Sequence, residues 1–202
     1  MPLWLADKPL VLASKSASRR AILEAAGIPL DIRPADIDER AVEGAAAPGA
    51  ADQVAKLLAR EKARAVAAGM PGRMVLGADQ TLSLGDRRFD KPADRNAARE
   101  QLRALAGKTH ELLSAIAFVR DGDVLYEHVE VARMTMRAFS DRFLDAYLDA
   151  VGAAVTASVG AYQVEGAGIH LFAAIDADHS TILGLPLLPA LSFLRAEGYL
   201  EA

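Results

Sequence analysis

Cysteine is absent from this 202-residue sequence, which excludes disulfide bonds, thiolate nucleophiles and cysteine-bound metals. Any bound metal ion therefore needs oxygen or imidazole ligands. The sequence also lacks an apolar run of roughly 18 residues, the length that indicates a membrane-spanning helix. Its first residues do not combine a basic segment with a long apolar one, as a secretory leader would. These absences favour a cytoplasmic protein that has no membrane partner.

No single sign of charge dominates the sequence, whose formal net charge is −4. Acidic and basic residues are interleaved, so the chain offers no extended basic surface for nucleic acid, although a compact anion needs only a local basic pocket. Internal repeats, low-complexity tracts and linkers are absent too. Since 52% of the residues are apolar, we expect a single domain over residues 1–202, built as one core or as two closely packed lobes.

Segments with strand and helix patterns alternate along the chain. Short apolar runs predict strands at 9–13, 30–33, 73–78 and 169–175, and helical spacing predicts helices at 53–68, 93–104, 140–150 and 187–197. A further helix follows Ser14–Arg20 and ends at Gly27, residues 43–51 form a loop, and Gly85-Asp86 forms a hairpin turn. Two long strand patterns within 110–138 flank the turn sequence Arg120–Asp123. This order predicts an α/β fold with a mixed sheet.

The segment Ser14-Lys-Ser-Ala-Ser-Arg19-Arg20 lies between the first predicted strand and the first predicted helix. At such a position, backbone N–H groups and the positive end of the helix dipole point at one spot, and hydroxyl and guanidinium groups add to it. That combination suits a triphosphate, although the glycine-rich P-loop spacing is absent. The ordinary alternative is that Ser14 or Ser16 caps the helix while both arginines lie in solvent.

Carboxylates follow two of the predicted strands. Asp36, Asp38 and Glu39 come after the second strand, and Asp79 is expected to lie directly at the end of the buried run Val75–Ala78. Mg²⁺ commonly takes one or two carboxylates together with substrate phosphates and water, so acidic residues at strand ends fit metal-assisted phosphate chemistry. Each of them could equally be a solvated turn residue. Asp79 is the favoured candidate, because it should emerge where a buried strand opens into a crevice.

Lysines supply the candidate cations. Lys56 and Lys62 lie on a predicted helix, where a lysine usually extends into water. The hairpin after Asp79, in contrast, could bring Lys91 back toward that carboxylate, where an ammonium would neutralise phosphate charge that develops in the transition state. The histidines show no metal-ligand spacing and are expected to be strand or loop residues: His110, His128, His170 and His179.

Taken together, these segments resemble the Maf family along nearly the whole chain. The matching motifs, in order, are Leu12–Arg20, Asp38-Glu39, Ala59–Ala63, Gly77–Gln80, Lys91-Pro92, Leu105–His110, Gly160–Gly166 and Gly184–Leu187. Several dispersed motifs in the correct order and spacing are far more specific than any one of them. The sequence departs from the family pattern at Ala17, where proline is usual, and at Ser180-Thr181, where Asn-Val is frequent.

The resemblance implies an inosine-triphosphatase-like architecture, with an elongated mixed sheet, flanking helices, a deep cleft between two lobes and frequent pairing as a homodimer. It also implies that a small-molecule nucleoside triphosphate is hydrolysed at its α–β phosphoanhydride with a divalent metal, Mg²⁺ or Mn²⁺. In that mechanism Asp79 is the base or a metal ligand, Glu39 helps to hold the metal, and Lys62 and Lys91 are the catalytic cations. The implied substrate-binding residues of the first loop are Ser14, Ser16, Ser18, Arg19 and Arg20.

Two positions bear on the base of the nucleotide. The family branch that acts on dTTP and UTP usually has Thr and Gln where this chain has Gln80 and Glu165, and both residues resemble the branch that acts on 7-methyl-GTP. Glu165 would accept hydrogen bonds from a guanine edge and complement a methylated, positively charged ring. Ser18 replaces an aromatic residue that is frequent in that branch, so base stacking would need another residue, such as Trp4 or Phe172.

Three other functions compete with this prediction. The first is a dTTP or UTP pyrophosphatase. The second is a nucleotide-binding, septum-related regulator that binds without turnover, against which the retained Asp79, Glu39 and lysines argue. The third is a structural or interaction protein, which would leave the clustered serines and arginines of the first loop unexplained. Incubation with nucleoside triphosphates and Mn²⁺, followed by detection of pyrophosphate, separates an enzyme from a regulator.

Overall fold

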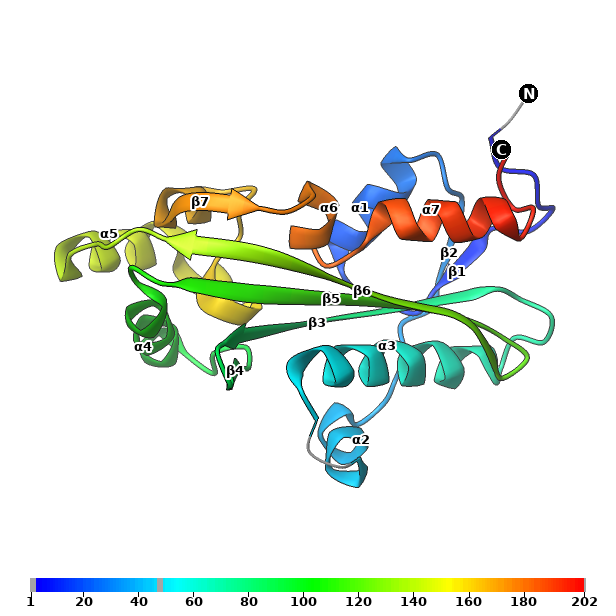
Figure 1. Cartoon of the computed structure of the whole chain (residues 1–202), viewed down its shortest axis with the longest axis horizontal. Coiled ribbons are helices and arrows are strands. Elements are labelled where there is room, and N and C mark those ends of the chain that lie inside the picture. The colour runs from blue at the N-terminus through cyan, green and yellow to red at the C-terminus, as the bar shows by residue number, and fades with distance from the viewer. Residues whose placement is uncertain (1–2, 47–48, 202) are drawn as a thin grey trace. The chain divides into compact units, whose positions relative to one another are not determined.

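The computed structural model describes residues 3–46 and 49–201, which form a mixed α/β fold. Within them, a seven-stranded sheet has the order β2-β1-β3-β5-β6-β7, with β4 paired to β3 (Figure 1). The pairs β1–β2 and β1–β3 are parallel, whereas β3–β4 and β6–β7 are antiparallel. The mixed sheet expected from the sequence is therefore confirmed. Residues 47 and 48, in the loop predicted at 43–51, lie outside the described residues.

The strands are β1 (Leu10–Leu12), β2 (Leu30–Ile32), β3 (Val75–Leu84), β4 (Arg87–Phe89), β5 (Thr109–Arg120), β6 (Asp123–Met136) and β7 (Phe172–Asp176). The α-helices are α1 (Ala17–Ala25), α2 (Glu39–Ala45), α3 (Ala51–Ala67), α4 (Arg95–Leu105), α5 (Asp141–Val151), α6 (His179–Ile182) and α7 (Leu187–Ala196). Short 3-10 helices are η1 (Gly152–Thr156), η2 (Val159–Ala161) and η3 (Ala167–Leu171). In the described part of the chain, no helix combines the length and apolar character that crossing a membrane requires.

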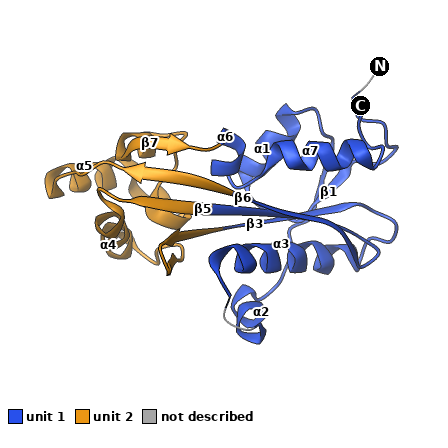
Figure 2. Ribbon diagram, viewed as in Figure 1, with its two compact units in different colours: residues 1–80, 113–130, 178–202 blue, residues 81–112, 131–177 orange. Residues whose placement is uncertain are grey.

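The chain divides into two compact units, which Figure 2 shows in different colours. Unit 1 consists of residues 1–80, 113–130 and 178–202, and unit 2 consists of residues 81–112 and 131–177. Strands β3, β5 and β6 contribute residues to both units. The polypeptide therefore passes between the units several times, and neither unit is one continuous stretch of sequence.

In unit 1, helices cover both faces of the central strands (Figure 1). Along β3, Leu76 and Ala78 pack in a buried cluster with Leu23 of α1 and Leu194 of α7. Val75 points to the opposite face and packs with buried alanines of α3, since successive side chains of a strand alternate. In this part of β3, odd-numbered positions therefore face α3 and even-numbered positions face α1 and α7.

Gly77 is the point at which α3 comes closest to β3. A Cβ atom added at Gly77 would lie 2.0 Å from the backbone oxygen of Ala59 and 2.9 Å from the Cβ atom of Ala63. Only a residue without a side chain fits there. Both alanines are fully buried, and their small side chains let the helix backbone approach the strand. Lys62 lies between these two alanines in the sequence of α3, so its backbone is close to β3.

The prediction that the third strand ends at Asp79-Gln80 is wrong, because β3 continues to Leu84. The parallel partner β1 stops at Leu12, which pairs with Leu76. β3 also has β5 as a neighbour in the sheet, and at Leu82–Leu84 it pairs with β4 as an antiparallel partner. Asp79 thus lies inside a strand but past the end of β1. A buried carboxylate is tolerated at this position because cationic side chains reach it.

Other observed boundaries also differ from the predicted ones. The loop predicted at 43–51 begins only after α2, and the strand predicted at 169–175 begins only at Phe172, because η3 precedes it. His170 and His179 lie in η3 and α6, not in a strand or loop as predicted, whereas His110 and His128 lie in β5 and β6 as expected. Short helices such as α6 carry too few residues to show a periodic pattern.

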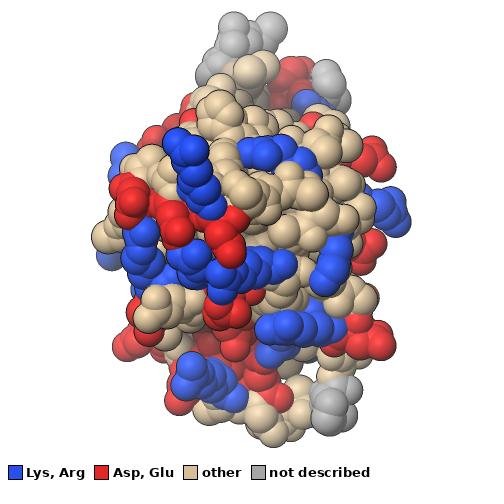
Figure 3. Space-filling view, turned by 90° about the vertical axis from the view of Figure 1, so that its left-hand side faces the viewer, with Lys and Arg blue, Asp and Glu red and all other residues tan. Residues whose placement is uncertain are grey.

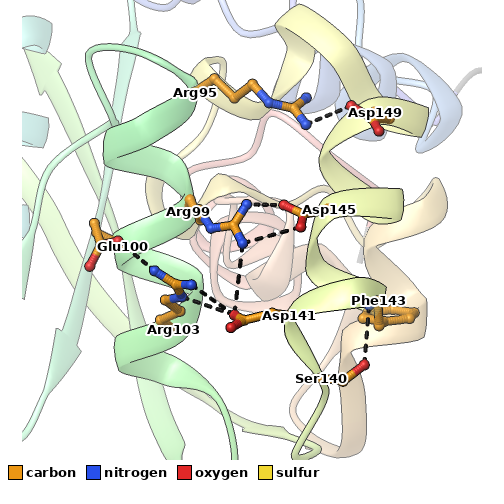
Figure 4. Close-up of polar contacts among 9 residues, drawn as sticks. All are labelled: Arg95, Arg99, Glu100, Arg103, Ser140, Asp141, Phe143, Asp145 and Asp149. Carbon is orange, nitrogen blue, oxygen red and sulfur yellow. Dashed lines mark hydrogen bonds and ion pairs between the residues drawn. The ribbon is translucent and has the colours of Figure 1, made fainter.

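In unit 2, a ladder of ion pairs joins α4 to α5 (Figure 4). Arginines recur every four residues on α4 and aspartates every four residues on α5, so each helix presents one charged stripe. The pairs are Arg95–Asp149, Arg99–Asp145 and Arg103–Asp141, an order that makes the helices antiparallel. Hydrogen bonds from Arg103 hold the pKa of Asp141 below its usual value.

On the face in Figure 3, basic and acidic side chains are interleaved, in agreement with the sequence pattern.

The interior of unit 2 contains a buried histidine–tyrosine pair. His110 Nε2 lies 2.7 Å from the Tyr162 hydroxyl oxygen, and the ring of Phe172 packs against both side chains. Burial lowers the pKa of His110 to about 4 and raises the pKa of Tyr162. His110 is therefore uncharged near neutral pH and belongs to the core of unit 2.

Replacing Gly77 with alanine should destabilise the protein. The added methyl group would overlap the Ala59 carbonyl oxygen, so the helix or the strand must shift, and such overpacking typically costs about 1–3 kcal/mol. Gly69→Ala is the matched control, because the nearest atom to a Cβ there is the Val66 oxygen at 3.8 Å, an ordinary contact. Denaturant unfolding of both variants measures the difference. Equal free energies of unfolding would contradict the close approach of α3 to β3.

Candidate active site

The loop between β1 and α1 is organised by its serines. Ser16 is the N-cap of α1, and its hydroxyl oxygen accepts a hydrogen bond from the backbone N–H of Arg19. Ser14 is buried, and its hydroxyl oxygen accepts a hydrogen bond from the Ser16 N–H at 3.2 Å. The capping role considered for these serines is confirmed for Ser16.

Arg19 and Arg20 have opposite surroundings. The Arg19 guanidinium donates through Nη1 to the Ala78 carbonyl oxygen at 2.7 Å and through Nε to the Gly184 carbonyl oxygen at 2.8 Å. Arg19 therefore ties α1 to β3 and to the segment after α6. The alternative in which both arginines lie in solvent is wrong for Arg19. Arg20 is exposed and pairs with Glu24, one turn along the same helix.

Three charged side chains from three elements of unit 1 meet beside β3. The Lys62 Nζ atom of α3 lies 2.6 Å from Asp79 Oδ1 and 2.8 Å from Glu39 Oε1. The side chains of Lys62 and Asp79 are only 13% and 10% exposed, whereas that of Glu39, at the start of α2, is 52% exposed. Asp79 and Gly77 point to the same face of β3, so the close contact at Gly77 brings Lys62 within reach of Asp79.

Burial raises the pKa of Asp79, and the positive charges of Lys62 and Arg19 oppose that rise. Burial also lowers the pKa of Arg19, which the charges of Asp79 and Glu39 oppose. Because an arginine stays protonated in proteins, Arg19 is a permanent positive charge near these carboxylates. The site thus sets two carboxylates against two cations. Asp79 and Lys62 are largely removed from water, where an unpaired charge would be strongly unfavourable, whereas Glu39 is half exposed.

Asp79 and Glu39 are the residues that fit a divalent metal ion. Oxygens of both carboxylates contact the same ammonium group, so the carboxylates converge on one point. Among residues 3–46 and 49–201, no group of three or more His, Cys, Asp or Glu side chains is arranged as a metal site. Two carboxylates match the way in which Mg²⁺ is usually bound, with phosphates and water as its other ligands.

On the other face of β3, hydrogen bonds fix the Gln80 amide. Its Nε2 donates to Ser114 Oγ at 2.8 Å and to the carbonyl oxygens of Thr181 and Ile182 at 3.3 and 3.0 Å. Ser114 in turn donates to the Thr181 carbonyl oxygen, and the Thr181 hydroxyl donates to Glu130. Because carbonyl oxygens only accept, the NH₂ group of Gln80 must face them. Oε1 is thus the atom that Gln80 can present to a ligand.

The other residues singled out from the sequence lie elsewhere. Asp36 is exposed, Asp38 caps α2, and Lys56 pairs with an aspartate of its own helix. Lys91 and Glu165 belong to unit 2, where both are exposed. Their expected contacts with phosphate and base stay predictions, as does the contact expected for Ser18.

The two rings considered for base stacking both pack against other rings. In unit 1, Trp4 lies 5.5 Å from Tyr199, measured between ring centroids. In unit 2, Phe172 meets Tyr162 edge to face at 4.9 Å. Each ring thus contributes to the packing of its own unit, and its stacking role stays a prediction.

Sequence reasoning did not connect Gln80 and Arg19 with the residues that hold them in place. Ser114 carries a usable signal, because it is a hydroxyl residue inside the apolar run Leu112–Val119. Thr181 had been noted only as a departure from the family pattern. Gly184 has a φ of 88°, and a Cβ there would lie 3.2 Å from Arg19 Nη2, so glycine leaves room for the guanidinium.

A buried carboxylate paired with a lysine, close to a helix-capping loop in an α/β fold, is an arrangement that suits an enzyme acting on phosphate groups. The family model described as Maf-like protein matches residues 9–197, and the chain belongs to this family. The resemblance found in the dispersed motifs is therefore confirmed.

Several known proteins are similar to this chain. The "Nucleoside triphosphate pyrophosphatase" of Rhodopseudomonas palustris (strain BisB5) is 58% identical over 200 residues, which cover 98% of each chain. The "7-methyl-GTP pyrophosphatase" of Brucella abortus biovar 1 (strain 9-941) is 53% identical over 190 residues, which cover 93% of this chain and 96% of the relative. The solved HAM1 protein from Coxiella burnetii aligns with a TM-score of 0.44 and 18% identity, over 63% of this chain and 72% of that one.

Replacing Gln80 with glutamate should destabilise the protein, although the two side chains have the same shape. A carboxylate does not donate hydrogen bonds, so its oxygen would face the carbonyl oxygens of Thr181 and Ile182. An unsatisfied buried polar group costs about 1–3 kcal/mol, and the partly buried Gln80 should lie toward the lower end of that range. Gln163→Glu, at an exposed position, is the matched control. Denaturant unfolding at neutral pH measures both. If Gln80→Glu unfolds at the same denaturant concentration as Gln163→Glu, this network does not fix the amide.

Proposed function

We propose that this chain hydrolyses a nucleoside triphosphate at its α–β phosphoanhydride, giving a nucleoside monophosphate and pyrophosphate. The observation that carries the proposal is Asp79, a buried carboxylate that contacts Lys62 and lies in the electrostatic field of Arg19. Membership of the Maf family and the printed names of its relatives support this activity. Phosphoryl transfer depends mainly on alignment and charge neutralisation, so it needs neither a thiol nor a serine nucleophile.

The reaction requires a water molecule to attack phosphorus while pyrophosphate leaves. The water oxygen forms the new bond to phosphorus, the bond from phosphorus to the bridging oxygen breaks, and a proton of the water must be accepted. Lys62 contacts Oδ1 of Asp79, so we assign Oδ2 as the atom that orients the water and accepts its proton.

The first turn of α1 and Arg20 are assigned to the phosphates. Helix N-termini favour negative charge because their N–H groups and dipole point toward it. Arg20 is exposed, and its ion pair with Glu24 is of the weak surface type that a phosphate can replace. Arg19 is assigned a different part, because its Nε and Nη1 donors hold the loop against β3 and the segment after α6.

A divalent metal, Mg²⁺ or Mn²⁺, completes the proposed site. Asp79 Oδ1 and Glu39 Oε1, the oxygens that share Lys62, would hold it together with phosphate oxygens. When bound, such an ion stabilises the negative charge that develops on the phosphates. We assign Lys91 to the same developing charge, as its Lys-Pro motif implies.

The proposed substrate is a 7-methylguanine nucleotide, with dTTP or UTP as the alternative. Gln80 offers Oε1 as a hydrogen-bond acceptor, which suits a base that carries N–H donors. The carboxylate of Glu165, as the family resemblance implies, would complement a positively charged ring. The name of the Brucella relative favours this base. A nucleotide-binding regulator without turnover is the competing class of function.

We also propose that the enzyme works in the cytoplasm, because nucleoside triphosphates are made and consumed there.

Pairing as a homodimer is proposed from the family resemblance. Sedimentation of the purified protein over a range of concentrations would measure its oligomeric state.

Asp79→Asn should fold normally and lose at least about two orders of magnitude in turnover, the scale for loss of a positioned base or key electrostatic group. Pyrophosphate released from nucleoside triphosphates with Mn²⁺ gives the rate, and circular dichroism checks the fold. Asp36→Asn, at an exposed position, is the matched control and should keep full activity. Turnover near that of wild type in a folded Asp79→Asn protein would remove Asp79 from the mechanism.

Glu165→Gln keeps the size of the side chain but removes its charge, so discrimination between 7-methyl-GTP and GTP should shrink. The expected change is roughly 1–3 kcal/mol, as for a charge-assisted hydrogen bond. The measurement is kcat/KM for 7-methyl-GTP, GTP, UTP and dTTP in both proteins. A wild-type preference for UTP or dTTP would overturn the proposed base. An equal loss on every substrate would place Glu165 in catalysis or structure.

A further inference from the structure

Lys62 occupies the point on which the proposed metal ligands converge. Its Nζ atom contacts Asp79 Oδ1 at 2.6 Å and Glu39 Oε1 at 2.8 Å, so one ammonium bridges both carboxylates. Each of the three side chains comes from a different element of unit 1, β3, α2 and α3. A hard divalent cation would need the same two oxygens.

The backbone leaves Lys62 little choice of position. The close contact of Ala59 and Ala63 with Gly77 fixes the height of α3 above β3, and the Lys62 side chain is mostly buried. Without a cation between them, the two converging carboxylates would repel each other, and the mostly buried Asp79 would lack a compensating charge. Lys62 therefore stabilises the metal-free site by a charge that a metal ion would otherwise supply.

We propose that Lys62 is a resident counter-cation that competes with the divalent metal for Asp79 and Glu39. This inference rests on the metal site of the proposed function. Metal binding breaks both ion pairs of Lys62, which lowers the affinity of the empty site for metal. The displaced ammonium then needs a new anionic partner, and the substrate phosphates provide one. The coupling is reciprocal, so metal and nucleotide each strengthen the binding of the other.

The direct test measures Mn²⁺ binding to the protein without nucleotide, by electron paramagnetic resonance of the free ion. Lys62→Met removes the charge and keeps an apolar stem of similar length, so Mn²⁺ should bind about tenfold more tightly or better, given the strength of charge interactions at such short range. Lys56→Met is the matched control, because Lys56 pairs with Asp52 on the same helix and touches neither carboxylate. That variant should bind Mn²⁺ as wild type does.

A second variant separates direct competition from a general change in charge. Adding Glu39→Gln to Lys62→Met should abolish most of the gain in Mn²⁺ affinity, because one of the contested ligands is lost. Mn²⁺ should also raise the melting temperature of Lys62→Met more than that of wild type, which reports binding even if the variant is less stable without metal. Lys62→Gln serves as the replacement if Lys62→Met does not fold.

Displacement can also be observed in the wild-type protein. The ¹⁵Nζ resonance of Lys62, assigned by its loss in Lys62→Gln, should change as diamagnetic Mg²⁺ is added, because both ion pairs break. Unchanged Lys62 resonance at saturating Mg²⁺, unchanged or weaker Mn²⁺ binding by the Lys62 variants, or no metal binding by any of the proteins would each overturn the inference. Metal competition without hydrolysis of any nucleotide would overturn only the proposed function, and hydrolysis without competition only this inference.

Discussion

The approach of α3 to β3 at Gly77 is the contact on which the candidate site depends. A helix that carried larger residues than Ala59 and Ala63, or a strand with any side chain at residue 77, would move the two elements apart. Lys62 would then reach Asp79 only in part, and the buried carboxylate would lose its nearest compensating charge. A steric feature, the absence of a Cβ atom, thus determines whether an electrostatic one is possible.

The charged groups of unit 1 are also interdependent. Arg19 holds the β1–α1 loop against β3 while its charge acts on Asp79 and Glu39, so the same guanidinium serves structure and electrostatics. On the opposite face of β3, Gln80 connects the strand to Ser114 and to the backbone of α6. Adjacent residues of one strand therefore have separate tasks, because alternation directs their side chains to different helices.

Much of this arrangement could be predicted from the sequence, because long periodic segments and dispersed motifs are local in the chain. The strand–loop–helix from Leu10 to Ala25 and the long β5–β6 hairpin belong to this class. The hairpin turn at Gly85-Asp86 calls for a strand before it, but its continuity with Val75–Ala78 in one long β3 depends on where β1 stops and β4 begins to pair, which no local pattern shows. For the same reason, the bonds of Arg19 to Ala78 and Gly184 join residues far apart in sequence that no local pattern connects.

The ladder between α4 and α5 has a consequence for how these helices find their alignment. Apolar contacts are largely non-directional, so a helix can slide along its neighbour and lose little of the free energy that these contacts contribute. The repeated charges remove that freedom: moving α5 by one turn would leave an arginine at one end and an aspartate at the other without partners. Shifting the register of α5 by a single residue would turn its stripe of aspartates away from the arginines of α4. The ion pairs thus determine the register of the two helices. Inserting or deleting one residue in either helix would disrupt every ion pair beyond that point.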